Sequence, residues 1–160
     1  MSTQEGIFKE LGFDPQAVRQ PEGAIVYALA RTYGLVIRRL TKIYKRFDLS
    51  SASFNLLLLL QRGQEPESFT QQVISERLVV SPSDMTGLID RLERRGLVRR
   101  IPGRDRRTNL LRITPKGVQL VERIWPHHAE EIRRLSLALS VRDAQLLGRV
   151  LAQLRGVARN

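Results

Sequence analysis

Residues 94–116 carry nine arginines and lysines and a single acid, Asp105. Guanidinium groups suit phosphate binding because each presents several N–H donors and a fixed positive charge. The densest part of the run places Arg104, Arg106 and Arg107 around Asp105. We therefore expect this stretch to contact phosphates, and a solvated basic face is the alternative.

The composition of the whole chain limits the classes of function and partner that are possible for this basic stretch. The chain has 160 residues, with 27 lysines and arginines against 16 acidic residues, a net charge of +11 and no cysteine. A chain of this length buries enough surface to fold without disulfides or metals. The absence of cysteine excludes disulfides, cysteine-ligated zinc and thiol catalysis. The positive charge favours an anionic partner, either nucleic acid or a membrane surface.

Membrane, metal and catalytic interpretations find little support in the sequence. An apolar run such as Leu56–Leu60 is far below the roughly 20 residues of a spanning helix, and residues 1–21 contain no apolar leader segment. We therefore expect a cytoplasmic protein without a membrane partner. The adjacent His127 and His128 would point to different helix faces, so we expect no metal site. No catalytic triad, P-loop or dinucleotide motif is present, so we expect no enzyme activity and no cofactor.

The spacing of apolar and capping residues predicts the elements that must hold the basic stretch. The predicted helices span about 23–47, 51–62, 70–78 and 82–95, two more begin at about 115 and 141, and the strands span about 97–101 and 110–114. Pro126 should kink the helix that contains it. Residues 1–22 form an extension with one short amphipathic turn. The expected fold class is mainly α with a small β-hairpin.

The helix predicted over 82–95 has the clearest start in the sequence. Ser81 is placed to cap it, Pro82 takes the first helical position, and Asp84 lies near the positive end of the helix dipole. Its first turns carry small polar side chains able to reach base edges and phosphates. These side chains are Ser81, Ser83, Asp84 and Thr86.

Two short helices joined by a tight turn and followed by a basic hairpin form a winged helix-turn-helix arrangement. The second of these helices, over 82–95, is predicted to enter the major groove of DNA. The hairpin tip carries Arg104, Arg106 and Arg107, which can reach the adjacent minor groove, where the negative potential attracts arginine.

Two segments of the sequence resemble the MarR-type (multiple antibiotic resistance regulator) family of winged helix-turn-helix transcription regulators. Residues 78–100, LVVSPSDMTGLIDRLERRGLVRR, resemble that family's recognition-helix region. Residues 105–107, DRR, and residues 111–117, LRITPKG, resemble its wing and the start of the helix that follows. The motifs occur in the family's order and spacing, and the resemblance covers about residues 24–155.

The resemblance implies a homodimer that binds a pseudo-palindromic operator in double-stranded DNA, usually as a repressor. In this family the first, fifth and sixth helices form the dimer interface. Residues 23–50 and 115–160 would then form the helical dimerisation region, and residues 51–114 the DNA-binding domain.

The resemblance also assigns roles to three charged residues. Carried over by position, Arg107 would enter the minor groove and Asp105 would orient an arginine of the wing. A turn-forming role is the alternative for Asp105. Arg91 would brace the recognition helix against the wing or contact a backbone phosphate.

Many members of the family are released from DNA by a small anionic, often aromatic ligand. The resemblance implies that such an effector binds between the dimerisation region and the winged helix. Five residues border that position on the predicted helices, and core packing is the alternative for each of them. They are Tyr27, Arg31, Tyr33, Phe54 and Leu57.

The sequence departs from the family's pattern in the turn before the recognition helix. Val79 stands where the family often has glycine, and a β-branched side chain disfavours positive φ, so we expect a turn of different construction. Ser75 replaces a usual alanine, which is a mild change. The absence of cysteine places the chain outside the thiol-sensing members and favours reversible ligand binding as the switch.

These features together predict a dimeric, sequence-specific DNA-binding regulator that responds to a ligand. The alternative is a sequence-nonspecific architectural protein that binds DNA or RNA. A protein-interaction module built on the same scaffold ranks last, because its wing should be neutral or acidic and this one is strongly basic.

Overall fold

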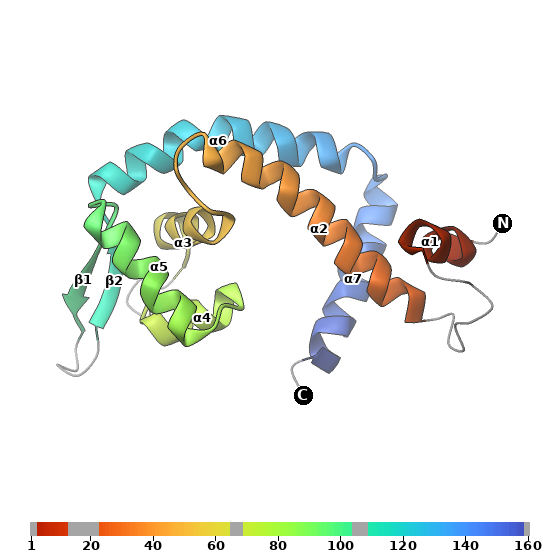
Figure 1. Ribbon diagram of the computed structural model, residues 1–160, viewed down its shortest axis with the longest axis horizontal. Coiled ribbons are helices and arrows are strands. Elements are labelled where there is room, and N and C mark those ends of the chain that lie inside the picture. The colour runs from red at the N-terminus through yellow and green to blue at the C-terminus, as the bar shows by residue number, and fades with distance from the viewer. Residues whose placement is uncertain (1–2, 13–22, 65–68, 104–108, 159–160) are drawn as a thin grey trace.

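The computed structural model describes residues 3–12, 23–64, 69–103 and 109–158. The elements in chain order are α1 (Thr3–Leu11), α2 (Ala24–Lys45), α3 (Ser51–Arg62), α4 (Gln71–Leu78), α5 (Pro82–Arg94), β1 (Val98–Pro102), β2 (Asn109–Ile113), α6 (Pro115–Ser136) and α7 (Val141–Ala158). Figure 1 shows α2 and α6 forming an arch, with α3, α4, α5 and the hairpin below one end and α1 and α7 at the other. This architecture confirms the predicted fold class. Among the described helices, none is long and apolar enough to cross a membrane.

Side-chain caps fix where most of these helices begin. At the start of four helices, the hydroxyl oxygen of the residue before the helix accepts a hydrogen bond from the backbone N–H three residues later. These capping residues are Thr70, Ser81, Thr114 and Ser140. Ser50 caps α3 in the same way. A serine or threonine hydroxyl before each of these helices therefore determines where the helix begins.

Two helices differ from their predicted course. Helix α2 ends at Lys45 instead of continuing to Phe47, because Asp48 takes a left-handed backbone conformation with φ 55° that turns the chain into α3. Helix α6 continues through Pro126 as a single, gently curved helix that forms part of the arch in Figure 1. Buried Val121 and Ile124 precede the proline, and His128 beyond it bonds to Tyr44 of α2. Packing on both sides of Pro126 therefore keeps the helix continuous.

Helix α3 lies at the centre of the hydrophobic core. Phe54, Leu56 and Leu57 are fully buried, as the nearly continuous apolar sequence of this helix predicts. Helix α3 contacts α2, α4, α5, α6 and β2. The helices of the arch and the helices below it therefore share one core.

The N-terminal extension contains a helix of nine residues instead of a single short turn. Helix α1 contacts α2, with Phe8 buried and Glu10 accepting a hydrogen bond from Arg31 of α2 at 2.9 Å. This exposed ion pair contributes little by itself, so burial of Phe8 is the main local anchor.

Val79 contradicts the expectation of a differently built turn between α4 and α5. Its backbone adopts φ 52° and ψ 51°, the left-handed conformation that glycine favours. The N–H groups of Val79 and Val80 both bond to the carbonyl of Ser75 and close the turn. Ile74 and Met85 are buried on either side, so packing of α4 against α5 imposes this conformation on valine.

Substituting Val79→Gly should stabilise the fold. The Val79 side chain is 91% exposed, so its removal costs almost no packing, while glycine relieves the left-handed strain. We expect the free energy of unfolding to rise by about 1 kcal/mol in urea titrations. Val141→Gly, at an exposed valine in ordinary helical backbone, should lower it. A Val79→Gly protein no more stable than the parent would contradict the strain argument.

Candidate nucleic-acid interface

Helix α5 separates an apolar face from a polar one. Met85, Leu88, Ile89 and Leu92 are buried against the core. The structure brings the four predicted reading residues together at the exposed start of the helix, and these are Ser81, Ser83, Asp84 and Thr86. The N-terminus of α5 therefore presents hydroxyl groups and backbone N–H groups to solvent, as a groove-reading helix requires.

Hydrogen bonds hold these polar side chains in defined positions. The Ser81 hydroxyl donates to Asp84 Oδ2 at 2.6 Å, and its oxygen accepts from the Asp84 N–H at 3.2 Å. The Thr86 hydroxyl donates to the Pro82 carbonyl at 3.0 Å. The Asp84 carboxylate and the Thr86 O–H are thereby engaged within the first turn, and the exposed Ser83 hydroxyl, 3.1 Å from that of Ser81, is the more available group for DNA.

Gln71 is a functional candidate that the sequence reasoning missed. Its Nε2 donates to Thr86 Oγ1 at 2.6 Å and lies 3.4 Å from the Pro82 carbonyl, so it links α4 to the first turn of α5. The available signal was its position directly after the cap Thr70, at the start of the helix that packs against the recognition helix.

Arg100 ties the hairpin to helix α5. From strand β1 its guanidinium bonds to Asp90 at 2.6 Å and to Glu93, and its backbone N–H donates to Glu93 Oε1 at 3.0 Å. The hydrogen bond with Asp90 is the main cause that raises the pKa of Arg100 above its ordinary value. Arg100 therefore braces the hairpin against α5, a role that the family resemblance implied for Arg91 as one of two possibilities.

Arg91 lies elsewhere on α5, where it lines a surface hollow with Ser50 and Ser53 of the α3 start. Its side chain is exposed on the surface of α5. A phosphate contact remains the expectation for it.

The base of the hairpin is fixed from two further directions. Thr114 donates to the Gly96 carbonyl at 2.7 Å, and the backbone N–H of Leu111 donates to the Phe69 carbonyl at 2.8 Å. The strands pair antiparallel from Val98↔Ile113 to Pro102↔Asn109. The hairpin is thus anchored to α5, to α6 and to the segment before α4, and it projects away from the core in Figure 1.

The predicted wing residues Arg104, Asp105, Arg106 and Arg107 lie outside the described residues. Their positions in the chain fall between the last residue of β1 and the first residue of β2. Their roles remain predictions from the sequence.

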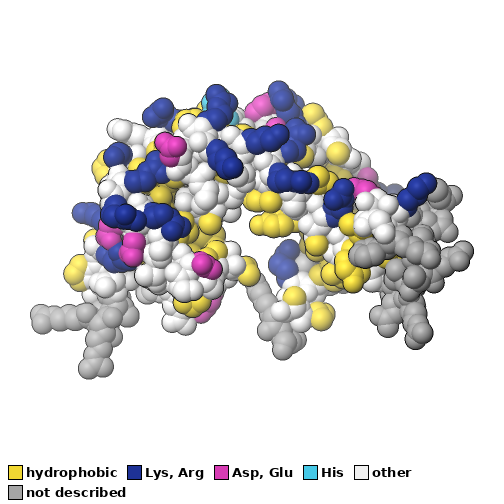
Figure 2. Space-filling model, viewed as in Figure 1, with side chains coloured by type: hydrophobic (Ala, Val, Ile, Leu, Met, Phe, Trp, Pro, Cys, Tyr) yellow, Lys and Arg dark blue, Asp and Glu magenta, His cyan; other side chains and the backbone are white. Residues whose placement is uncertain are grey.

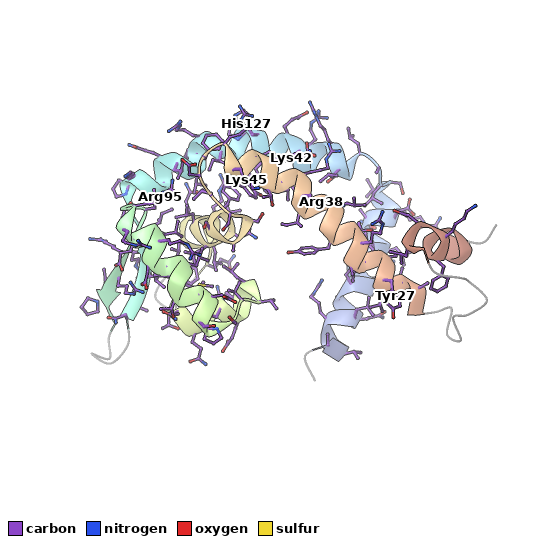
Figure 3. All side chains as sticks on the ribbon, in the orientation of Figure 1. Tyr27, Arg38, Lys42, Lys45, Arg95 and His127 are labelled. Atoms are coloured by element: carbon purple, nitrogen blue, oxygen red, sulfur yellow. The ribbon has the colours of Figure 1, made fainter. Side chains whose placement is uncertain are left out.

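The five predicted effector-site residues fall into two groups. Phe54 and Leu57 are fully buried in the core. Tyr27 and Tyr33 are 52% and 64% exposed on α2, and Arg31 on the same helix pairs with Glu10. Figure 3 places Tyr27 near the end of α2 that lies far from α3. Within a single chain these residues do not form one enclosed site.

His128 belongs to a partly buried aromatic cluster. Its Nδ1 lies 2.9 Å from the Tyr44 hydroxyl, and its ring centre is 5.1 Å from that of Phe54 and 5.3 Å from that of Trp125. Burial, with a smaller effect of Arg62, lowers the pKa of His128, and burial raises the pKa of Tyr44 to about 12. Both groups are neutral near pH 7. Within the described part of the chain, no three His, Asp or Glu residues cluster as metal ligands would.

Comparison with known proteins agrees with this geometry. The family model described as MarR family matches residues 47–108. The HTH-type transcriptional regulator PecS of Dickeya dadantii is 31% identical over 131 residues, which cover 79% of each chain. The chain belongs to the MarR family. Members of this family are transcriptional regulators and not enzymes.

Solved structures place this MarR-family chain among winged-helix proteins. A DNA complex of MepR from S. aureus matches with a TM-score of 0.74 and 21% identity, covering 82% of this chain and 96% of that one. CouR from Rhodococcus jostii RHA1, bound to p-coumaroyl-CoA, matches with a TM-score of 0.71 and 25% identity, covering 84% and 91%. The first of these likenesses supports the fold, and the second adds a relative that binds a ligand.

Replacing Arg100 by alanine should loosen the hairpin without unfolding the chain. Its side chain is 29% exposed, so the lost ion pairs should lower the free energy of unfolding by about 1 kcal/mol or less. Amide hydrogen exchange should nevertheless become faster along β1 and β2. Arg99→Ala removes an exposed neighbouring arginine and should leave exchange unchanged. Equal protection of the hairpin in both variants would show that Arg100 is not the brace.

Proposed function

We propose that this chain is a homodimeric, sequence-specific DNA-binding repressor released by a small anionic or aromatic ligand. The observation that carries the proposal is the exposed, hydrogen-bonded first turn of α5 beside a hairpin that Arg100 holds in a fixed position. A helix start with available hydroxyls suits the major groove, and an arginine-rich hairpin tip suits the adjacent minor groove.

Unburied apolar surface on three helices supports a homodimer. None of the described residues of α7 is buried, although its sequence carries a regular apolar stripe. Figure 2 shows hydrophobic side chains gathered over the α2 and α7 end of the molecule. A monomer rarely exposes such a patch. The large exposed hydrophobic residues of α2, α6 and α7 are Ile25, Val26, Tyr27, Leu29, Tyr33, Leu35, Ile132, Val141, Leu146, Leu147, Val150 and Val157.

The position of this exposed apolar surface supports a division of the chain into two functional regions. Residues 23–50 and 115–160 form the dimerisation region, and residues 51–114 form the DNA-binding domain. A two-fold axis through the dimerisation region would present two recognition helices to DNA, about one helical turn or roughly 34–36 Å apart. Such a pair would read a pseudo-palindromic operator.

The ligand-responsive part of the proposal rests on relatives and on position. CouR is a relative with p-coumaroyl-CoA bound, and the curated relative IacR of Pseudomonas putida is a transcriptional repressor, 29% identical over 126 residues. Tyr27, Arg31 and Tyr33 lie on the N-terminal half of α2 in the proposed dimerisation region, and Phe54 and Leu57 lie in the core within α3. A second copy packed against α2 would add the surface that these separated positions lack for an enclosed ligand site.

Arg107→Ala tests the proposed reading mode. The wild-type chain should enrich an operator from a random duplex library and bind it at least about 10³-fold more tightly than random duplex. Loss of the minor-groove arginine should weaken operator binding by about 1–3 kcal/mol in fluorescence anisotropy titrations. Lys9→Ala, which removes one positive charge from the distant helix α1, should bind the operator like the parent.

A ratio near one between operator and random duplex would favour the architectural, sequence-nonspecific alternative. Unchanged operator affinity in Arg107→Ala would remove the hairpin tip from the reading mode. Both affinities must be compared at one salt concentration, because phosphate contacts make binding steeply salt-dependent.

A further inference from the structure

A second cluster of cations lies away from the proposed DNA-reading face, at the opposite end of helix α5. Arg46, Arg95, Lys116 and Arg123 line a surface hollow of about 390 Å³ between the α2–α3 turn and the first half of α6. We define these four residues as the basic groove. A rise of 1.5 Å per residue places Arg95 about 20 Å from Ser81 along α5, so the groove is separate from the exposed helix start.

One acidic residue lines the basic groove, and the acids nearby on α6 are engaged elsewhere. Asp48 is the acidic residue among those that line the groove, whereas four lining residues are cationic. Glu122 of α6 accepts from Gln61 and lies 3.9 Å from Arg62, and Glu131 pairs with Arg39. The groove therefore keeps a strongly positive potential.

Hydrogen bonds within the protein use only some of the N–H donors of these four cations. Arg95 donates to the carbonyls of Phe47 and Asp48, and Lys116 donates to the Arg95 carbonyl at 2.8 Å. A guanidinium has five N–H donors and an ammonium has three, so both groups keep donors for a ligand. Arg123 lies 5.7 Å from the Phe47 ring centre, and Arg46 is exposed on the rim. The half-buried Phe47 ring adds an apolar surface to the same hollow.

The positive surface continues on both sides of the groove. A neighbouring hollow shares Asp48 and Arg95 and adds Arg91 and Arg94. On the other side, helix α2 contains no acidic residue, and Figure 3 shows Arg38, Lys42 and Lys45 following one another along it towards Arg95. An approaching anion would be attracted over this whole surface and held where the hollow allows several contacts.

We propose that the basic groove is a binding site for a small molecule that carries a phosphate or polyphosphate group. Three guanidinium groups favour phosphate because each can donate two parallel hydrogen bonds to its oxygens. The volume is that of a small-molecule site, and the Phe47 ring can pack against an apolar or planar part of the ligand. A ligand here would contact the end of the recognition helix, the α2–α3 turn and α6 together.

Calorimetric titration of the full chain with sodium pyrophosphate, in about 0.15 M salt, tests this site. We expect one saturable site per chain. Because the double variant Arg46→Ala/Arg123→Ala loses two groups that can make charge-assisted hydrogen bonds to the ligand, it should bind at least about tenfold more weakly. Both side chains are exposed, so the variant should fold, which urea titration checks. Arg46→Lys/Arg123→Lys keeps the charge but loses the paired N–H donors, so it should bind more weakly than the parent and more tightly than the alanine variant.

The matched control is Lys9→Ala/Arg142→Ala, which removes the same charge from exposed positions on α1 and α7. It should bind pyrophosphate within about twofold of the parent. Three results would overturn the site: no saturable binding, equal weakening in the control, or loss of binding in Arg106→Ala/Arg107→Ala with none in Arg46→Ala/Arg123→Ala. The second would indicate diffuse charge attraction, and the third would place the anion at the hairpin tip.

Discussion

Helix α3 is packed against α2, α4, α5, α6 and β2, and its side chains Phe54, Leu56 and Leu57 have no exposed surface. Burying one such side chain stabilises a fold by about 1.5–3 kcal/mol, so this helix joins its neighbours strongly. The long helices of the arch and the helices of the winged domain consequently share a single core. Helix α3 thereby contacts α2 and α6 of the arch as well as α5.

Polar contacts position the exposed groups on this apolar base. Each is individually modest: a hydroxyl cap at Ser81, an amide contact from Gln71 to Thr86, and the partly exposed ion pairs of Arg100. Their effect is geometric, because they hold the start of α5 and the hairpin in one orientation. A reading surface with fixed groups loses less entropy on binding than a mobile one.

The sequence predicted what depends on neighbouring residues and missed what depends on distant ones. Caps such as Ser81 and Thr114, and the apolar face of α5, follow from spacing within one helix, and the structure confirms them. The Arg100 brace joins residues of different elements, so arginine-rich sequence alone gave no reason to prefer it over Arg91. Val79 adopts the left-handed conformation that its side chain disfavours, because tertiary packing of α4 on α5 outweighs the conformational preference of a β-branched residue. The basic groove was hidden because its four cations come from three separate parts of the chain.

In the proposed dimer, exposed apolar residues of α2, α6 and α7 pair two copies, so that two α5 helices read one operator. Hydroxyl-radical footprinting on DNA enriched by the wild-type chain can detect this arrangement. Such a dimer should protect two half-sites of related sequence, with centres about one helical turn, roughly 34–36 Å, apart. A single protected half-site, or uniform protection without sequence symmetry, would contradict it.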